Sequence, residues 1–139
     1  MITCTRRLEF DAAHRILNHE SKCKMLHGHR YVVEASFEAK KLDDLGRVID
    51  FGVIREVLGA WIEDNFDHNT ILCKKDKKLG DQIALATGQK IFYLDENPTA
   101  ENIAKFLLTE ICPKLFAKKH VKCVAIKLYE TPNCYVEVK

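Results

Sequence analysis

The sharpest chemical feature of the sequence is the tripeptide His27-Gly28-His29. Residues 27–39 are rich in β-forming residues and alternate in part between apolar and polar types, so they predict a strand. Residues i and i+2 of a strand point to the same face, and both imidazoles can therefore reach one ion. The glycine between them has no side chain and permits a close approach.

His14, in FDAAHRIL, supplies a third imidazole. It comes at the end of a strand that begins with the predicted residues 3–10, and the polar loop 18–25 separates that strand from the histidine pair. If the two strands form a hairpin, His14 lies beside the pair. Three neutral imidazoles with one open coordination position are typical of a catalytic rather than a structural zinc site. We therefore predict that His14, His27 and His29 bind one Zn²⁺; the alternative is two surface histidines on a strand and one unrelated histidine.

Cys23 lies four residues before His27, in the polar stretch NHESKCK. It could be a fourth ligand, which would close the site and make it structural. It could equally stand off the metal as a thiolate that acts as general base or nucleophile. Its place in a loop rather than on the strand favours the independent role.

Two further acidic residues, Asp67 and Glu130, are candidates for a catalytic or binding role. Asp67-His68, at the end of a predicted helix, pairs a carboxylate with an imidazole, and with Cys23 in reach it would form a proton relay. Adjacent residues on a helix do not face each other, so the pair is meaningful only if the helix ends there; otherwise it is an exposed helix end. Glu130 ends an apolar strand, where it is either solvated or aimed into a pocket to bind an N–H/NH₂ edge of a heterocycle.

Two helices are predicted from the spacing of apolar residues. The first covers residues 51–65, and Asp50 is placed to cap its N-terminus. The second follows Thr99, a candidate N-cap, with Glu101 in the first turn where negative charge favours the helix dipole. Pro113 should end or kink it.

The remaining segments complete the expected architecture. Residues 41–46 have turn chemistry, 73–90 read as a polar loop-like insertion with a short helical piece, and 91–94 as a short strand or edge. Residues 121–130 and 134–138 predict a hairpin around TPN. This order predicts an α+β fold with helices on one face of an antiparallel sheet.

Composition limits the class of protein. The chain has 139 residues, 47% of them hydrophobic, which favours one compact domain over residues 1–139 rather than disorder. No run approaches the roughly 18–20 apolar residues of a membrane span, and no secretory signal begins the chain. Six cysteines without a CxxC pair indicate thiols in a cytoplasmic protein, and Cys4, Cys112 and Cys123 lie in apolar stretches typical of buried positions. The net charge of +2, spread along the chain, gives little reason to expect nucleic acid.

Taken together, several segments resemble one family, the 6-pyruvoyl-tetrahydropterin synthases and their bacterial relatives, the 6-carboxytetrahydropterin synthases. The resemblance runs in order along almost the whole chain: FDAAH at 10–14, CKMLHGHRYVVE at 23–34, VIDFG at 48–52, FDH at 66–68, PTAENIA at 98–104 and YETP at 129–132. It implies the tunnelling fold, in which a four-stranded antiparallel sheet carries two helices on one face. Three subunits of that fold join their sheets into a barrel, and two trimers stack as a hexamer.

The resemblance also implies residue roles. The family's zinc histidines match His14, His27 and His29, its catalytic cysteine matches Cys23, and its Asp-His partners match Asp67 and His68. Its pterin anchor matches Glu130, assisted by Thr99 and Glu101. Active sites in this family lie between subunits, so some of these groups are expected to serve a neighbour's pocket.

The spacing of three residues between the cysteine and HGH, together with ETPN, is similar to the 6-carboxytetrahydropterin branch of queuosine and deazapurine biosynthesis. This implies a zinc-dependent carbon–carbon lyase that converts 7,8-dihydroneopterin triphosphate to 6-carboxytetrahydropterin, acetaldehyde and triphosphate. Alternatives are elimination of triphosphate to 6-pyruvoyl-tetrahydropterin, cleavage of dihydroneopterin for folate synthesis, and a non-catalytic zinc-stabilised interaction module. Two departures from the family pattern, DHNTIL after residue 66 and a longer 73–97 stretch, lie near the expected rim of the pocket.

Overall fold

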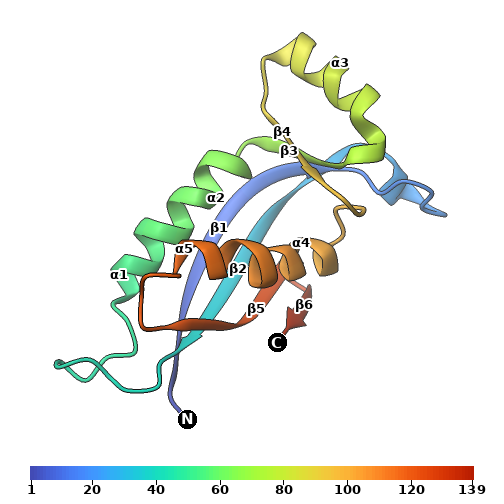
Figure 1. Cartoon of the computed structure of the whole chain (residues 1–139). Helices are drawn as coiled ribbons and strands as arrows, with labels where there is room; N and C mark the ends of the chain where they lie inside the picture. The colour runs from blue at the N-terminus through green and yellow to red at the C-terminus, as the bar shows by residue number, and fades with distance from the viewer.

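The computed structural model describes residues 1–139 and is built around one six-stranded sheet. The strand order is β4-β3-β1-β2-β5-β6, with β1–β2, β2–β5 and β5–β6 antiparallel and β1–β3 and β3–β4 parallel. The strands are β1 (Thr3–His14), β2 (His27–Glu38), β3 (Asn69–Cys73), β4 (Ile91–Leu94), β5 (Lys122–Thr131) and β6 (Cys134–Val138). Figure 1 shows β1 and β2 as the two long strands at the centre of this curved sheet.

Two helical segments pack on the same face of the sheet (Figure 1). The first joins α1 (Phe51–Ile54), the π-type turn Arg55–Gly59 and α2 (Ala60–Asn65), and the second joins α4 (Ala100–Phe106), the π-type turn Leu107–Ile111 and α5 (Cys112–Leu115). A third helix, α3 (Lys77–Thr87), lies apart from these two segments, at the end of the sheet that β3 and β4 form. None of the helices has the length and apolar character that crossing a bilayer requires.

The core lies between the sheet and the two packed helical segments. Strand residues such as Phe10, Tyr31 and Phe37 are fully buried on the face that the helices cover, against Leu58 and Leu107. Phe10 stacks on Tyr31 with ring centroids 4.8 Å apart. The same face of β1 and β2 therefore continues from the core into His14 and His29, so the rigid sheet fixes their positions.

Most predicted elements are confirmed. The helix over residues 51–65 and its cap are present, because the N–H of Gly52 donates to the Asp50 side chain at 2.7 Å. Thr99 caps α4 by accepting from the N–H of Asn102 at 3.2 Å. The hairpin of β5 and β6 turns through Pro132 and Asn133 as expected.

Other expectations were wrong. The four antiparallel strands β1, β2, β5 and β6 exist, but β3 and β4 extend the sheet in parallel, so it is six-stranded and mixed. The helical piece expected within segment 73–90 is present, but it is longer than expected: the eleven-residue helix α3 fills most of the segment and makes three helical segments instead of two. Of the two outcomes expected at Pro113, an end or a kink, the helix does not end there, since the helical backbone runs on to Leu115 after a wide π-type turn that tolerates the missing N–H. Phe51, an apolar residue at the start of the predicted helix 51–65, is exposed rather than packed on the sheet.

Candidate metal centre and active site

The hairpin register brings three histidine rings together. His14 pairs directly with His27, and Ala12 pairs with His29, so all three side chains lie on one face of β1 and β2. His27 Nε2 lies 3.2 Å from His14 Nε2 and 3.1 Å from His29 Nε2. Nitrogen atoms that share one tetrahedral zinc at 2.0–2.1 Å would lie roughly 3.3–3.4 Å apart. The spacing therefore fits a single ion at the centre of the three rings.

Gly28 makes this close pairing possible. A Cβ atom at this position would lie 3.2 Å from the carbonyl oxygen of Ala12 across the hairpin, which is tighter than ordinary packing. A larger residue would require β1 and β2 to shift by a few tenths of an ångström at the point where His14 faces the His27–His29 pair.

The hydrogen bonds of the rings fix which nitrogen atoms are available. His14 Nδ1 lies 2.7 Å from the carbonyl oxygen of Pro98, and His27 Nδ1 lies 2.7 Å from that of Met25. A carbonyl oxygen only accepts, so each Nδ1 carries the proton in the neutral ring and each Nε2 presents a lone pair. Lone pairs that converge in this way repel one another unless a cation lies between them, and carbonyl partners of this kind are typical of metal-binding histidines.

Burial favours the neutral forms of His14 and His29. Desolvation lowers the pKa of His14 to about 4, and nearby His27 and His29 lower it further against the opposing Pro98 hydrogen bond. Desolvation also lowers the pKa of His29. The hydroxyl of Tyr31 lies 3.1 Å from His14 Nδ1, and burial raises the pKa of this tyrosine. Neutral imidazole is the form that binds a metal, so the lowered pKa values of His14 and His29 favour metal binding at physiological pH.

A hollow of about 310 Å³ opens beside His14, and the structure brings four more predicted residues to its wall: Cys23, Thr99, Glu101 and Glu130. Glu130 Oε1 lies 3.9 Å from His14 Nε2. In the cluster at this hollow, the ligand atoms of His14, His27 and His29 lie within 4.8 Å of one another, and the sulfur of Cys23 is not among them. Cys23 therefore faces the same hollow as the rings without completing their cluster.

The loop that carries Cys23 is tied to the start of α4. The N–H of Ile16 donates to the carbonyl oxygen of Cys23 at 2.9 Å. Asn97 makes two hydrogen bonds with the backbone of Leu17, each 3.0 Å long. The same short segment supplies the Pro98 carbonyl that orients His14. Asn97 and Tyr31 were not identified from the sequence, where nothing distinguishes a clamping asparagine or a buried tyrosine from an ordinary one.

Asp67 and His68 form a hydrogen-bonded pair after helix α2, next to Asp11 of β1. Helix α2 ends at Asn65, and His68 has a left-handed backbone with φ of 57°, which lets its Nδ1 reach Asp67 Oδ2 at 2.8 Å. The N–H of Asp11 donates to Asp67 Oδ1 at 2.9 Å. Partial burial raises the pKa of Asp67, but hydrogen bonds from the Asp11 N–H and from His68 outweigh it and lower that pKa overall. The hydrogen bond to Asp67 raises the pKa of the exposed His68.

The pair does not meet Cys23 within one chain. Arg30 joins Asp11 at 2.8 Å, and these two residues are direct partners in the register one position away from Ala12 and His29. Because side chains alternate along a strand, Asp11 and Arg30 point to the sheet face opposite the histidine rings. Asp67 and His68 cluster with Asp11. The predicted relay of Cys23, His68 and Asp67 is therefore not assembled by a single copy.

Comparison with known proteins places this geometry in a family. A sequence model described as "6-pyruvoyl tetrahydropterin synthase" matches residues 3–139. The 6-carboxy-5,6,7,8-tetrahydropterin synthase of Rickettsia conorii is 58% identical over 138 residues, which are 99% of this chain and 100% of that one. Among solved structures, an uncharacterized protein of Wolinella succinogenes superposes with a TM-score of 0.81 at 21% identity, covering 99% of this chain and 97% of that chain.

A second solved structure has an assigned activity. The 6-pyruvoyl tetrahydropterin synthase of Plasmodium falciparum superposes with a TM-score of 0.66 at 19% identity, covering 98% of this chain and 96% of that chain. Both solved structures share the fold. The chain belongs to the 6-pyruvoyl tetrahydropterin synthase family.

Proposed function

We propose that the protein is a zinc-dependent 6-carboxy-5,6,7,8-tetrahydropterin synthase of the cytoplasm. It converts 7,8-dihydroneopterin triphosphate and one water molecule to 6-carboxytetrahydropterin, acetaldehyde and triphosphate, with residues 1–139 acting as one domain. The observation that carries this proposal is the convergence of three Nε2 atoms beside a hollow that Cys23 and Glu130 also line. The Rickettsia conorii relative, similar over its whole length, supports the choice of reaction.

The three rings would hold the metal. Zinc favours imidazole nitrogen, and a site with three protein ligands leaves a position open for substrate. When bound, the ion would stabilise negative charge that develops on the side-chain oxygen atoms of the substrate. Tyr31 and the carbonyl oxygens of Pro98 and Met25 orient the rings for this task.

Glu130 would hold the pterin. A carboxylate can accept two charge-assisted hydrogen bonds from the N–H and NH₂ groups of the heterocycle. Thr99 and Glu101, at the N-terminus of α4, line the same wall and would assist. This anchoring matters because a misplacement of about 1 Å can lower a rate on the order of a hundredfold.

Cys23, as thiolate, would remove the proton from the substrate side chain. Its proton would pass to His68, which Asp67 orients through the 2.8 Å hydrogen bond. Since these two residues lie on the other sheet face of their own chain, we propose that they come from a neighbouring copy. β1 pairs with β3 only at residues 12–14, so the preceding part of β1 has one free edge. In a trimer that shares one barrel, this free edge of one copy would lie beside β6 of the next, and two such trimers would stack as a hexamer.

Product identification tests the reaction directly. Purified protein with zinc is incubated with 7,8-dihydroneopterin triphosphate, the pterin products are separated, and their masses are determined by mass spectrometry. The proposal predicts 6-carboxytetrahydropterin and acetaldehyde. A product that retains all side-chain carbons would instead identify a 6-pyruvoyl-tetrahydropterin synthase.

A further inference from the structure

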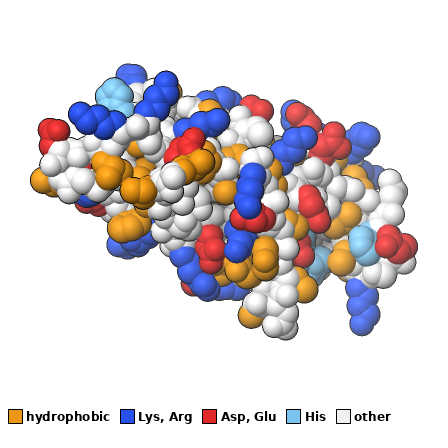
Figure 2. Space-filling model, turned by 90° about the horizontal axis from the view of Figure 1, so that it is seen from below, with side chains coloured by type: hydrophobic (Ala, Val, Ile, Leu, Met, Phe, Trp, Pro, Cys, Tyr) orange, Lys and Arg blue, Asp and Glu red, His pale blue; other side chains and the backbone are white.

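The charge around the hollow is unsuited to a substrate tail rich in phosphate. Two of the residues that line it, Glu101 and Glu130, are acidic, and no lysine or arginine is among them. The molecule also offers no broad basic surface on the face seen in Figure 2, where Lys and Arg mix with Asp and Glu. An anionic tail therefore needs a local group of cations or N–H donors near the mouth.

Among the residues that line the hollow, His19 has a side-chain N–H that can bind an anionic tail and that is not used to bind the metal. It lies on the loop between β1 and β2, is partly buried, and lines the hollow together with Cys23. Its Nδ1 accepts a hydrogen bond from the N–H of Ser21 at 2.9 Å. A ring nitrogen that accepts from a backbone N–H carries no proton, so the neutral ring has its proton on Nε2. That N–H makes no hydrogen bond with the protein and remains available as a donor.

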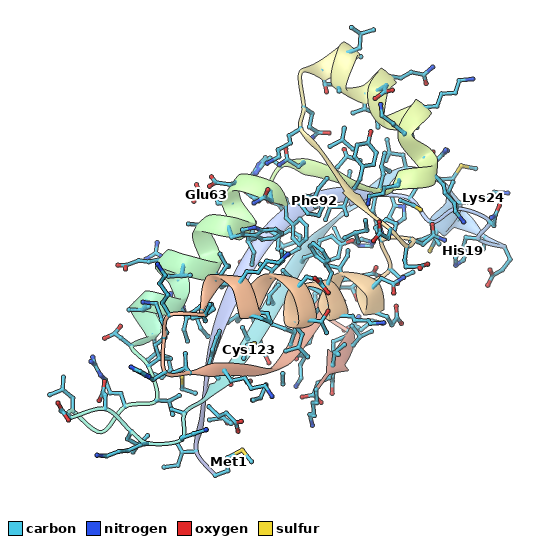
Figure 3. The ribbon with its side chains drawn as sticks, in the orientation of Figure 1. Met1, His19, Lys24, Glu63, Phe92 and Cys123 are labelled. Carbon is cyan, nitrogen blue, oxygen red and sulfur yellow. The ribbon has the colours of Figure 1, made fainter.

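Lys22 and Lys24 add positive charge beside it. They flank Cys23 in the short 3₁₀ turn Lys22–Lys24, and both are exposed. Neither ammonium group has a carboxylate within 4.0 Å, whereas Lys74 and Lys77 on the neighbouring insertion are paired with Asp95 and Asp81. Figure 3 shows His19 and Lys24 at the same end of the molecule.

The backbone that carries these groups is held in place. The N–H of Ile16 donates to the carbonyl oxygen of Cys23, and the two hydrogen bonds of Asn97 fix Leu17 at the start of the loop. The backbone of this loop therefore keeps a fixed position relative to the hollow, and binding an anion requires ordering little more than the two lysine side chains.

We propose that the cationic turn, defined as His19 with Lys22 and Lys24, binds the phosphoryl oxygen atoms of an anionic substrate tail. This inference rests on the proposed function in taking the ligand to be a pterin polyphosphate. The N–H of His19 and the two ammonium groups donate charge-assisted hydrogen bonds to phosphate. Glu101 and Glu130 repel the tail from the inner wall, so the heterocycle enters the hollow and the phosphates remain at the mouth.

Inorganic triphosphate is the probe for a binding test. Isothermal titration calorimetry is carried out on the metal-loaded full chain, and metal content is measured before and after titration to account for chelation. His19→Ala should weaken triphosphate binding about tenfold or more, and His19→Gln, which keeps an N–H donor, should restore part of it. Lys22→Ala/Lys24→Ala should weaken binding and reduce its salt dependence. The matched control is Lys118→Ala/Lys119→Ala, two exposed lysines that precede β5, which should leave binding unchanged.

A second ligand separates the subsite from the function. Phosphate-free 7,8-dihydroneopterin, followed by fluorescence, should bind wild type, His19→Ala and the Lys22/Lys24 double variant alike, and the KM for the triphosphate substrate should rise more than kcat falls. If all variants bind triphosphate as wild type does, the inference is overturned while the proposed function stands. If wild type fails to bind 7,8-dihydroneopterin, the proposed function fails, and the triphosphate titrations still decide whether the cationic turn binds phosphate.

Discussion

At the scale of single residues, the site depends on which nitrogen of each histidine is free. His14 and His27 each present Nε2 because a carbonyl oxygen occupies Nδ1. The convergence of the three histidine rings was predictable from the sequence, because HxH on a strand and a histidine at the end of its hairpin partner leave little geometric freedom. The positions of Asp67 and His68 were not, because adjacency in sequence does not say which sheet face a turn will reach.

The electrostatics of His68 give a prediction that does not depend on activity. The hydrogen bond to Asp67 raises the His68 pKa above its ordinary value of 6.5. In the folded protein His68 therefore keeps its proton to higher pH than in the unfolded chain. The stabilisation from this pair is complete below the unfolded pKa and is lost as pH rises through the folded pKa. NMR titration of the ring should show a raised pKa in wild type and a lower one in Asp67→Asn.

Asp64→Asn is the control for this titration, because Asp64 is an exposed carboxylate near the end of the same helix that makes no ion pair with His68. It should leave the His68 pKa unchanged. Equal pKa values in wild type and Asp67→Asn would show that the hydrogen bond between the two side chains does not form in solution.

At the scale of elements, the N-terminus of α4 links helix stability to the site. The Thr99 hydroxyl accepts a hydrogen bond from the N–H of Asn102. Loss of such a cap typically lowers the free energy of unfolding by about 1 kcal/mol. Thr99→Ala should therefore lower the free energy of unfolding by about that amount in urea denaturation. Thr99→Ser keeps the hydroxyl and should remain close to wild type. A Thr99→Ala variant as stable as wild type would exclude this capping role.

Helix α3 is held to β4 by a close contact. A Cβ atom on Gly80 would overlap the hydroxyl of Tyr93, so Gly80→Ala must displace that ring. Overpacking of this kind typically costs about 1–3 kcal/mol. Limited proteolysis should cut Gly80→Ala within α3 faster than wild type, with the exposed Gln82→Ala as the control. Unchanged cleavage of Gly80→Ala would mean that the helix does not pack on Tyr93.

The elements that the sequence did not reveal are short or polar. β3 has only four consecutive buried residues, Thr70 to Cys73, a run too brief to distinguish a parallel strand from a loop. α3 begins with two lysines and contains Gly80, so its helical signal was weak even though Gly88, at φ of 71°, ends it cleanly. The long strands and the two packed helices were predicted because their apolar periodicity is set by one large buried face.

At the scale of the whole molecule, one copy separates Cys23 from the Asp67–His68 pair. If neighbouring copies complete the site, Cys23→Ala and His68→Ala should each be nearly inactive alone. Dissociation and reassembly of an equal mixture should then restore about a quarter of wild-type activity, since half of the copies carry each intact group. Activity assays before and after reassembly measure this. A mixture that stays inactive while forming mixed oligomers would contradict a shared site.

The central claim is that His14, His27 and His29 bind one zinc ion without the sulfur of Cys23. Elemental analysis of metal per chain, on protein purified without chelators, tests it most directly. We expect about one zinc per chain in wild type and in Cys23→Ala, and almost none in His29→Ala. Zinc lost from Cys23→Ala, or absent from wild type, would contradict the account.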